Sequence, residues 1–150
     1  MAEVEKICFT EKFGNKMISV SSVEVKSNKG IVKDRYFKAN NDKDLQITLI
    51  ELENIDYFNK KSNTNIPYID FRRNIITKEI ELNKLVGKEI LIGNVKIKGH
   101  RLCDPCKYLQ DKLKKNNSFK NLSSLYNRGG LRCEILSNGI ISIKDEIKII

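Results

Sequence analysis

The sequence predicts a mainly β fold, a closed or partly closed β-barrel with a few peripheral helices. Short runs rich in β-branched residues outnumber helical stretches, and turn-forming pairs, Gly93-Asn94 and Asn138-Gly139, separate several of these runs. Neither an internal repeat nor a linker divides the chain. A length of 150 residues fits one domain over residues 1–150, with a single sizeable core.

Composition predicts a soluble, cytoplasmic protein with no membrane partner. Hydrophobic residues make up 40% of the chain, and no run approaches the roughly 18 apolar residues of a membrane span. The N-terminus, with Glu3 and Glu5 beside short apolar pieces, lacks the layout of a signal peptide. Four cysteines in a chain of this size do not make a disulfide framework, so free thiols in a reducing compartment are expected.

A formal net charge of +9 favours anionic partners, which include nucleic acids, phosphorylated cofactors and acidic surfaces. The lysines are spread along the whole chain, aromatic residues amount to 7%, and no compact basic arm is present. This pattern argues against a dedicated nucleic-acid role and assigns much of the charge to a solvated surface.

The first part of the chain is predicted to form paired β structure. Residues 3–9 and 16–25 contain β-branched and alternating stretches, and MISVSSVEV, residues 17–25, is the clearer strand. This strand is expected to end before the turn-prone residues 27–30.

A turn is predicted next, where Asp34 and Arg35 place opposite charges side by side. Residues 40–44 form a polar loop, and QITLI, residues 46–50, a short buried strand. A helix is expected over residues 51–61. Its apolar spacing runs through Leu52, Ile55 and either Phe58 or Asn59.

Two adjacent arginines precede a short β-branched strand in FRRNIIT, residues 71–77. On a strand, Arg72 and Arg73 face opposite ways, so one can line a pocket while the other remains in solvent. An inward arginine could clamp a phosphate or carboxylate with two hydrogen bonds. The alternative is an internal salt bridge to a carboxylate such as Asp34 or Asp70.

The two turn pairs named above predict two hairpins, one within residues 89–99 and one within residues 131–143. The second, at Asn138-Gly139, is the strongest hairpin signal in the chain. A last strand is expected over residues 146–150. Before the second hairpin, an irregular polar region ends in Gly129-Gly130, which permits a sharp turn or a close backbone approach to a ligand.

GHRLCDPCKYL, residues 99–109, carries the only histidine, one of the two prolines and two of the four cysteines. Asp104 suits a helix N-cap and Pro105 the first helical position, so a helix is expected from Cys106 toward Lys115. The positive start of a helix stabilises a thiolate, and Cys106 lies in the first turn. Cys106 is therefore either a reactive or metal-binding sulfur or a buried, inert cysteine.

Cys103 forms a C-x-x-C pair with Cys106, a spacing compatible with a disulfide, a persulfide relay or half of a zinc site. A full zinc site needs about four ligands. His100, Cys8 or Cys133 could complete one only if the fold brings them together.

Taken together, several segments resemble, in order and spacing, the MOSC domain, a family named after the C-terminal domain of molybdenum cofactor sulfurase. They are KGIVKDR, FRRNIIT, LNKLVGKEILIGNVKI, CDPCKYL, LYNRGGLRCEIL and NGIISIKDEI, and they extend over about residues 17–147. The resemblance implies a β-barrel-like fold and a small, single-domain, bacterial-type member.

The resemblance also implies a molybdenum cofactor (molybdopterin) site. In the family, the cysteine of the Pro-Cys pair, here Cys106, either ligates molybdenum or carries sulfur as a persulfide. The matching pocket-forming or cofactor-binding residues are Asp34, Arg35, Arg73, Asn74, Arg128, Gly129 and Gly130. Two positions depart from the pattern, because Lys33 and Lys144 stand in predicted turns where the family often has glycine.

Three functions follow from the resemblance. The first is a molybdenum cofactor-dependent reductase of N-hydroxylated substrates, supplied with electrons by a partner, since the sequence shows no flavin or iron–sulfur site. The second is a sulfur carrier or cofactor-delivery module that uses a Cys106 persulfide and meets a cofactor-biosynthesis protein. The third is a domain that keeps the fold without a cofactor. A molybdenum cofactor site requires Asp34, Arg73 and Cys106 to converge in space.

Overall fold

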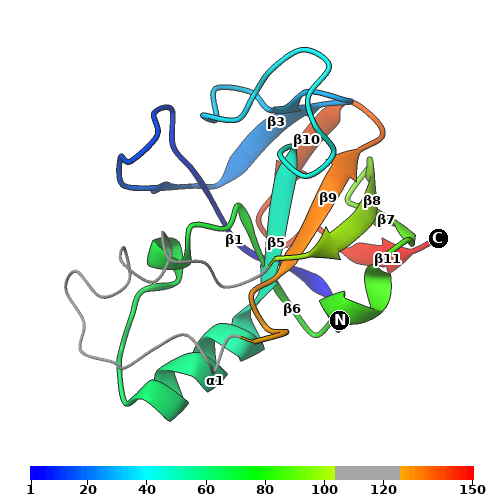
Figure 1. Cartoon of the computed structure of the whole chain (residues 1–150). Coiled ribbons are helices and arrows are strands. Elements are labelled where there is room, and N and C mark those ends of the chain that lie inside the picture. Colours follow the sequence, from blue (N-terminus) through cyan, green and yellow to red (C-terminus); the bar gives the residue numbers. More distant parts are fainter. Residues whose placement is uncertain (104–125) are drawn as a thin grey trace.

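The computed structural model describes residues 1–103 and 126–150. Within these residues the chain is mainly β, with one α-helix, α1, below the strands and at the opposite end from β3 and β10 (Figure 1). The mainly β prediction is therefore confirmed. The helix predicted from Cys106 toward Lys115, and most of the irregular region before Gly129, lie outside the described residues.

The strands form two sheets. They are β1 (Glu3–Phe9), β2 (Ile18–Val20), β3 (Ser22–Lys26), β4 (Gly30–Ile31), β5 (Ile47–Glu51), β6 (Ile75–Lys78), β7 (Glu89–Ile92), β8 (Val95–Leu102), β9 (Leu131–Ile135), β10 (Gly139–Ser142) and β11 (Ile147–Ile149). One sheet has eight strands in the order β11-β7-β8-β9-β5-β6-β1-β2, and the other has three in the order β10-β3-β4.

The large sheet curls until strands from its two ends meet. Glu3 of β1 forms an isolated antiparallel bridge with Glu146, the residue before β11. The Val4 N–H donates to the Asp145 carbonyl at 2.9 Å, and the Lys144 N–H donates to the Val4 carbonyl at 2.7 Å. Because β11 and β1 lie far apart in the strand order, these bonds confirm a partly closed barrel.

The strands β1, β5 and β6 are buried on both faces. Successive residues of each strand enter different hydrophobic clusters, the first of each pair inside the barrel and the second toward α1. The pairs are Ile7 and Cys8, Leu49 and Ile50, and Ile75 and Ile76. A sheet covered on both faces explains why each of these strands contains adjacent apolar residues where a half-buried strand would alternate.

Helix α1 (Leu52–Ser62) follows β5 directly and connects it to β6, with which β5 pairs in parallel. Parallel neighbours need such a crossover. The helix buries Ile55 and Phe58 against the sheet, and the Phe58 ring meets Phe71 edge-on, 5.6 Å between centroids. It ends at Asn63, whose φ of 52° is left-handed. The predicted helix over residues 51–61 is confirmed within one residue.

The predicted strand over residues 17–25 is two strands in different sheets. β2 pairs with β1, whereas β3 pairs with β10 and β4. The break is at Ser21, whose carbonyl accepts a hydrogen bond from Ile143 N–H at 3.0 Å. Alternation along the sequence marks extended backbone but not the strand with which it pairs.

The hairpin at Gly93-Asn94 is confirmed, because β7 and β8 pair through Ile92 and Val95. The hairpin at Asn138-Gly139 is wrong, since β9 pairs with β8 and β5 while β10 pairs with β3. The Asn138 side-chain oxygen accepts from the Ser27 N–H at 2.7 Å, near the end of β3. This turn therefore carries the chain from one sheet to the other.

Lys33 and Lys144, which stand where the resemblance implies glycine, both adopt left-handed backbone, each with a φ of 73°. In that conformation a residue with a side chain is about 1–2 kcal/mol less favourable than glycine. Glycine has more conformational entropy in the unfolded chain, which offsets part of this advantage. We expect Lys33→Gly and Lys144→Gly each to raise the free energy of unfolding by about 0.5–1 kcal/mol, measured by chemical denaturation.

Lys38→Gly is the matched control, because Lys38 is also an exposed loop lysine but has no positive φ. Lys38→Gly is expected to lower the free energy of unfolding by up to about 1 kcal/mol. Equal effects of the three substitutions would contradict the assignment of strain to Lys33 and Lys144.

Candidate functional site

The turn after β4 is held by a buried ion pair. The side chains of Asp34 and Arg35 are 2% and 8% exposed, and Asp34 Oδ1 lies 3.1 Å from Arg35 Nη1. Asp34 Oδ1 also accepts from the Thr10 N–H at 3.3 Å, and Oδ2 accepts from the Tyr36 N–H at 3.2 Å. The carboxylate thus fastens the turn to the end of β1.

Arg35 is fixed by further contacts. Its N–H donates to the Thr10 carbonyl at 2.8 Å, and its Nη1 lies 3.5 Å from the Met17 sulfur. The guanidinium carbon is 4.7 Å from the centroid of the Tyr36 ring, a cation–π distance. Arg35 is therefore presented in one orientation and does not move freely at the surface.

Asn74 joins three strands just before β6 begins. Its N–H donates to the Thr48 hydroxyl at 3.0 Å, and its Oδ1 accepts from the Thr48 N–H at 3.1 Å. Its Nδ2 donates to the Cys8 carbonyl of β1 at 3.2 Å. With its amide oxygen and nitrogen engaged in this way, the buried Asn74 side chain is a structural clamp between β1 and β5.

The prediction that Arg72 and Arg73 face opposite ways on a strand is wrong. The short 3-10 helix η1 (Tyr68–Phe71) precedes them, Arg72 has a left-handed φ of 61°, and β6 starts at Ile75. Both arginines consequently line the same pocket. Arg72 Nη1 donates to the Asn15 carbonyl at 2.9 Å, and Arg73 Nε donates to the Gly129 carbonyl at 2.8 Å.

This arginine pocket is a cavity of about 60 Å³ with a strongly positive lining. It contains four arginines against one carboxylate, Asp44: the arginines are Arg35, Arg72, Arg73 and Arg132. Asn74 and Thr48 also line it. At about 10–15 Å³ for each water-sized group, the space holds an oxyanion such as a phosphate. Guanidinium groups bind such anions with strong, charge-assisted hydrogen bonds.

Asp44 does not neutralise the pocket, because its carboxylate contacts side chains of β8. Oδ2 accepts from Arg101 Nε at 2.8 Å, and Oδ1 lies 3.0 Å from Nε2 of His100, the only histidine. The backbone carbonyl of Asp44 accepts from Arg132 Nη1 at 2.9 Å. The four guanidinium groups of the pocket therefore leave a net positive charge.

The two late glycines connect the arginine pocket to the cysteine segment. The Gly130 carbonyl accepts from the Cys103 N–H at 2.8 Å, and the Gly129 carbonyl accepts from Arg73. A Cβ on Gly129 would lie 2.7 Å from the Cys103 carbonyl oxygen. Arg73, Gly129 and Cys103 are thus neighbours, and Cys106 follows Cys103 by three residues, outside the described part of the chain.

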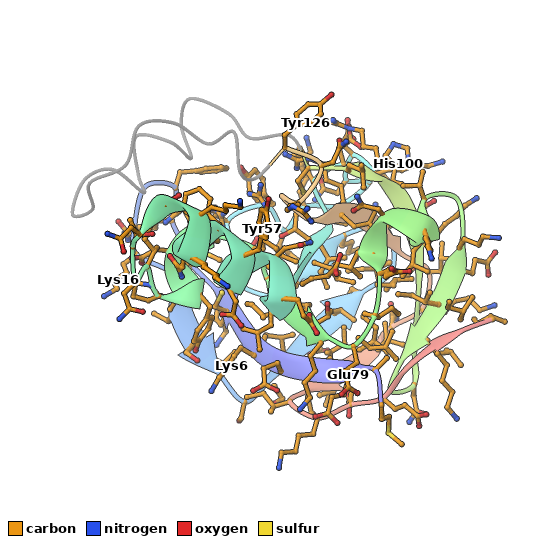
Figure 2. All side chains as sticks on the ribbon, turned by 90° about the horizontal axis from the view of Figure 1, so that it is seen from below. Lys6, Lys16, Tyr57, Glu79, His100 and Tyr126 are labelled. Atoms are coloured by element: carbon orange, nitrogen blue, oxygen red, sulfur yellow. The ribbon has the colours of Figure 1, made fainter. Side chains whose placement is uncertain are left out.

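Arg128 points toward α1 and does not line the arginine pocket. Its Nη1 donates to Asn54 Oδ1 at 3.4 Å, and its guanidinium carbon lies 4.1 Å from the Tyr57 ring centroid. In Figure 2, Tyr57 and Tyr126 lie on the same side of the molecule as His100, away from Lys6 and Glu79.

The three described cysteines are buried and free. Burial raises the pKa of the Cys8 thiol to about 12 and raises the pKa of Cys133 as well. Within residues 1–103 and 126–150, no three His, Cys, Asp or Glu side chains gather closely enough to hold a metal ion. Cys8 and Cys133 are therefore inert thiols in the folded protein.

Sequence reasoning missed Arg132 and Asp44 of the pocket. A usable signal for Arg132 was its place between two core residues of β9, Leu131 and Cys133. Alternation puts it on the opposite face of the strand, where a lone arginine needs an anionic or polar partner. No local pattern identified Asp44, whose place depends on the partner strand β8.

A curled, partly closed barrel with an arginine-lined pocket next to Gly129 and Cys103 defines a small β domain with a positively charged site. A family model described as the MOSC domain matches residues 32–148, most of the chain. The chain belongs to the MOSC domain family. This family is associated with the molybdenum cofactor.

Three solved structures share the fold at low sequence identity. The YuaD protein from Bacillus subtilis superposes with a TM-score of 0.86 at 16% identity, covering 99% of this chain and 94% of YuaD. YiiM from Geobacillus stearothermophilus gives 0.74 at 12% identity, covering 100% and 75% of the two chains. YiiM from Escherichia coli gives 0.71 at 14% identity, covering 100% and 70%.

No curated protein matches the sequence. Among the described residues, no helix is long and apolar enough to cross a membrane.

Proposed function

We propose that this domain binds the molybdenum cofactor, with the Cys106 thiolate as a ligand of the metal and the arginine pocket as the site of the cofactor's phosphate. One observation carries the proposal. Arg35 and Arg73, which are distant in sequence, line one pocket, and Arg73 contacts Gly129 beside Cys103. The pocket therefore lies close to the point where the chain enters the segment that contains Cys106.

The residues present fit an anionic cofactor. The arginine pocket has room for an oxyanion and a positive lining. Arg132 Nε is buried and has no hydrogen-bond partner among the described residues, which makes it a donor available to a ligand oxygen. Residues 1–103 and 126–150 offer no cluster of metal ligands, so this proposal assigns the metal to Cys106, which lies outside the described residues.

When bound, the cofactor supplies the redox chemistry at its metal. The protein's part is to hold it through Cys106, to orient it by its phosphate and to neutralise that phosphate with Arg35, Arg72, Arg73 and Arg132. We propose the reduction of an N-hydroxylated substrate, in which two electrons and two protons convert N–OH into N–H and water. The electrons come from a partner protein.

The second candidate is a sulfur carrier or cofactor-delivery module. In it, the Cys106 thiolate takes the terminal sulfur of a donor protein's persulfide, releasing the donor's thiol, and passes this sulfur to a cofactor-biosynthesis protein. It is supported by the free Cys103, three residues before Cys106, because a C-x-x-C pair is compatible with a persulfide relay. Free Cys8, Cys103 and Cys133 fit a reducing compartment, so a cytoplasmic location is part of both proposals.

We expect near-stoichiometric molybdenum in protein purified from a host that makes the cofactor, and its loss in Cys106→Ser. Serine keeps the size of the side chain but cannot supply the thiolate. Metal analysis and the fluorescence of the oxidised pterin measure the two components. Cys133→Ala is the control, because this buried thiol lies in the hydrophobic core and should leave the molybdenum content unchanged.

The two candidate functions differ in this experiment. A persulfide on Cys106, detected by mass spectrometry in protein without molybdenum, supports the carrier. Equal molybdenum in wild type and Cys106→Ser contradicts Cys106 as the ligand, and protein with neither molybdenum nor persulfide contradicts both functions.

A further inference from the structure

A second, larger cavity opens beside the arginine pocket. It measures about 470 Å³ and is lined by Phe13, Gly14, Arg35 and Tyr36. Arg35 and Tyr36 also line the arginine pocket, so the two cavities are neighbours. Its volume is in the range of sites that bind small organic molecules, whereas the arginine pocket alone admits little more than an oxyanion.

Phe13 is an exposed aromatic side chain that is nevertheless held in place. It lies in the loop between β1 and β2 and is 67% exposed. Its ring meets Tyr36 edge-on, with 5.0 Å between centroids and 89° between planes. Tyr36 in turn packs against Arg35. We name the pair Phe13 and Tyr36 the aromatic shelf.

The loop that carries Phe13 is attached to the arginine pocket. The Asn15 carbonyl accepts a hydrogen bond from Arg72 Nη1 at 2.9 Å, two residues beyond Phe13. Gly14 has a φ of +82°, and a Cβ placed on it would meet nothing within 4 Å. The side of Gly14 on which a Cβ would lie is therefore open, and a flat ring could approach the shelf from there.

We propose that the aromatic shelf binds the planar heteroaromatic ring of a ligand whose phosphate occupies the arginine pocket. Stacking on an aromatic side chain tolerates different rings, because each presents a π face. The guanidinium groups next to the shelf select a ring that carries an anion. A pterin of the bound cofactor and a phosphorylated heterocyclic substrate share this chemistry. In the first case the inference rests on the proposed function.

The test compares phosphate ligands with and without a ring. Guanosine 5′-monophosphate, ribose 5-phosphate and inorganic phosphate are titrated calorimetrically into the full chain, produced in a host that lacks the molybdenum cofactor. We expect the nucleotide to bind wild type about tenfold more tightly than ribose 5-phosphate. Phe13→Ala should abolish that difference without changing the affinity for ribose 5-phosphate.

Two further variants separate the shelf from the arginine pocket. Arg132→Gln should weaken all three ligands, because it removes a guanidinium that lines the arginine pocket. Tyr126→Ala should change none of them, since this side chain is 71% exposed and lines neither cavity. Unchanged melting temperatures confirm that Phe13→Ala and Tyr126→Ala still fold.

The two sources of the ring differ in protein loaded with cofactor. If Phe13→Ala loses pterin during purification, the ring is that of the cofactor. If loaded Phe13→Ala keeps wild-type pterin, while the cofactor-free variant discriminates less between the nucleotide and ribose 5-phosphate, the ring is that of a phosphorylated substrate. The arginine pocket then holds the substrate's phosphate and not the cofactor's. Equal affinities of wild type for the nucleotide and ribose 5-phosphate, or no binding of any ligand, overturn the proposal. The Cys106→Ser molybdenum result is independent of that outcome and tests the proposed function separately.

Discussion

Gly130→Ala is expected to lower the free energy of unfolding by about 4 kcal/mol or more, enough to reduce the melting temperature by roughly 10–15 °C in a chain of this length. Two causes act together. Gly130 has a φ of 108°, which a side chain rarely adopts, and its new Cβ would lie 2.1 Å from the Leu49 carbonyl oxygen. That oxygen belongs to the backbone of a central strand, so it cannot move aside without disturbing β5.

Gly87→Ala separates these two causes. Gly87 has a similar left-handed φ of 78°, but a Cβ there meets nothing within 4 Å. Gly87→Ala should therefore lower the free energy of unfolding by only about 1 kcal/mol, the contribution of backbone strain. Denaturant unfolding followed by circular dichroism measures both variants. A loss at Gly130 no larger than that at Gly87 would show that the backbone of β9 does not lie against β5 as described.

Local patterns in the sequence predicted the elements whose partners are close in sequence. The helix over residues 51–61 has clear apolar spacing, and the hairpin of β7 and β8 depends only on the turn at Gly93-Asn94. The failures at residues 17–25 and at Asn138-Gly139 have a common cause. In both, the backbone is extended, but the pairing strand lies far away in sequence, and period-two alternation carries no information about that partner.

The candidate site divides in the same way. The motifs identified Arg35, Arg73 and Asn74, and the structure places all three in the lining of one pocket. The motifs did not show that Asn74 clamps the strands β1 and β5, nor that Arg132 joins the lining, because these contacts exist only after β5 has met its neighbours. Which residues line the pocket depends on which strands pair, and this cannot be read from the sequence. The motif residues in the turns can be recognised from the sequence itself.

Asp34→Ala is expected to lower the free energy of unfolding by about 3–5 kcal/mol, because it leaves the buried Arg35 cation without its carboxylate. The Arg35 side chain is only 8% exposed, so water from the neighbouring cavities replaces the lost partner only in part. The N–H groups of Thr10 and Tyr36 lose their acceptor at the same time. Glu81→Ala is the control, since its ion pair with Lys84 is 70–76% exposed, so water screens the two charges and the loss of stability should be small.

The double variant Asp34→Ala with Arg35→Ala shows whether the ion pair itself is responsible. Removing both charges leaves neither one buried alone, so the double variant should be less destabilised than the sum of the single variants. Strict additivity, or a loss at Asp34 no larger than that at Glu81, would contradict the role of this pair. Because the turn presents both Arg35 and Tyr36, which line both cavities, Asp34→Ala should also weaken phosphate and ring binding together, unlike Phe13→Ala, which affects only the ring.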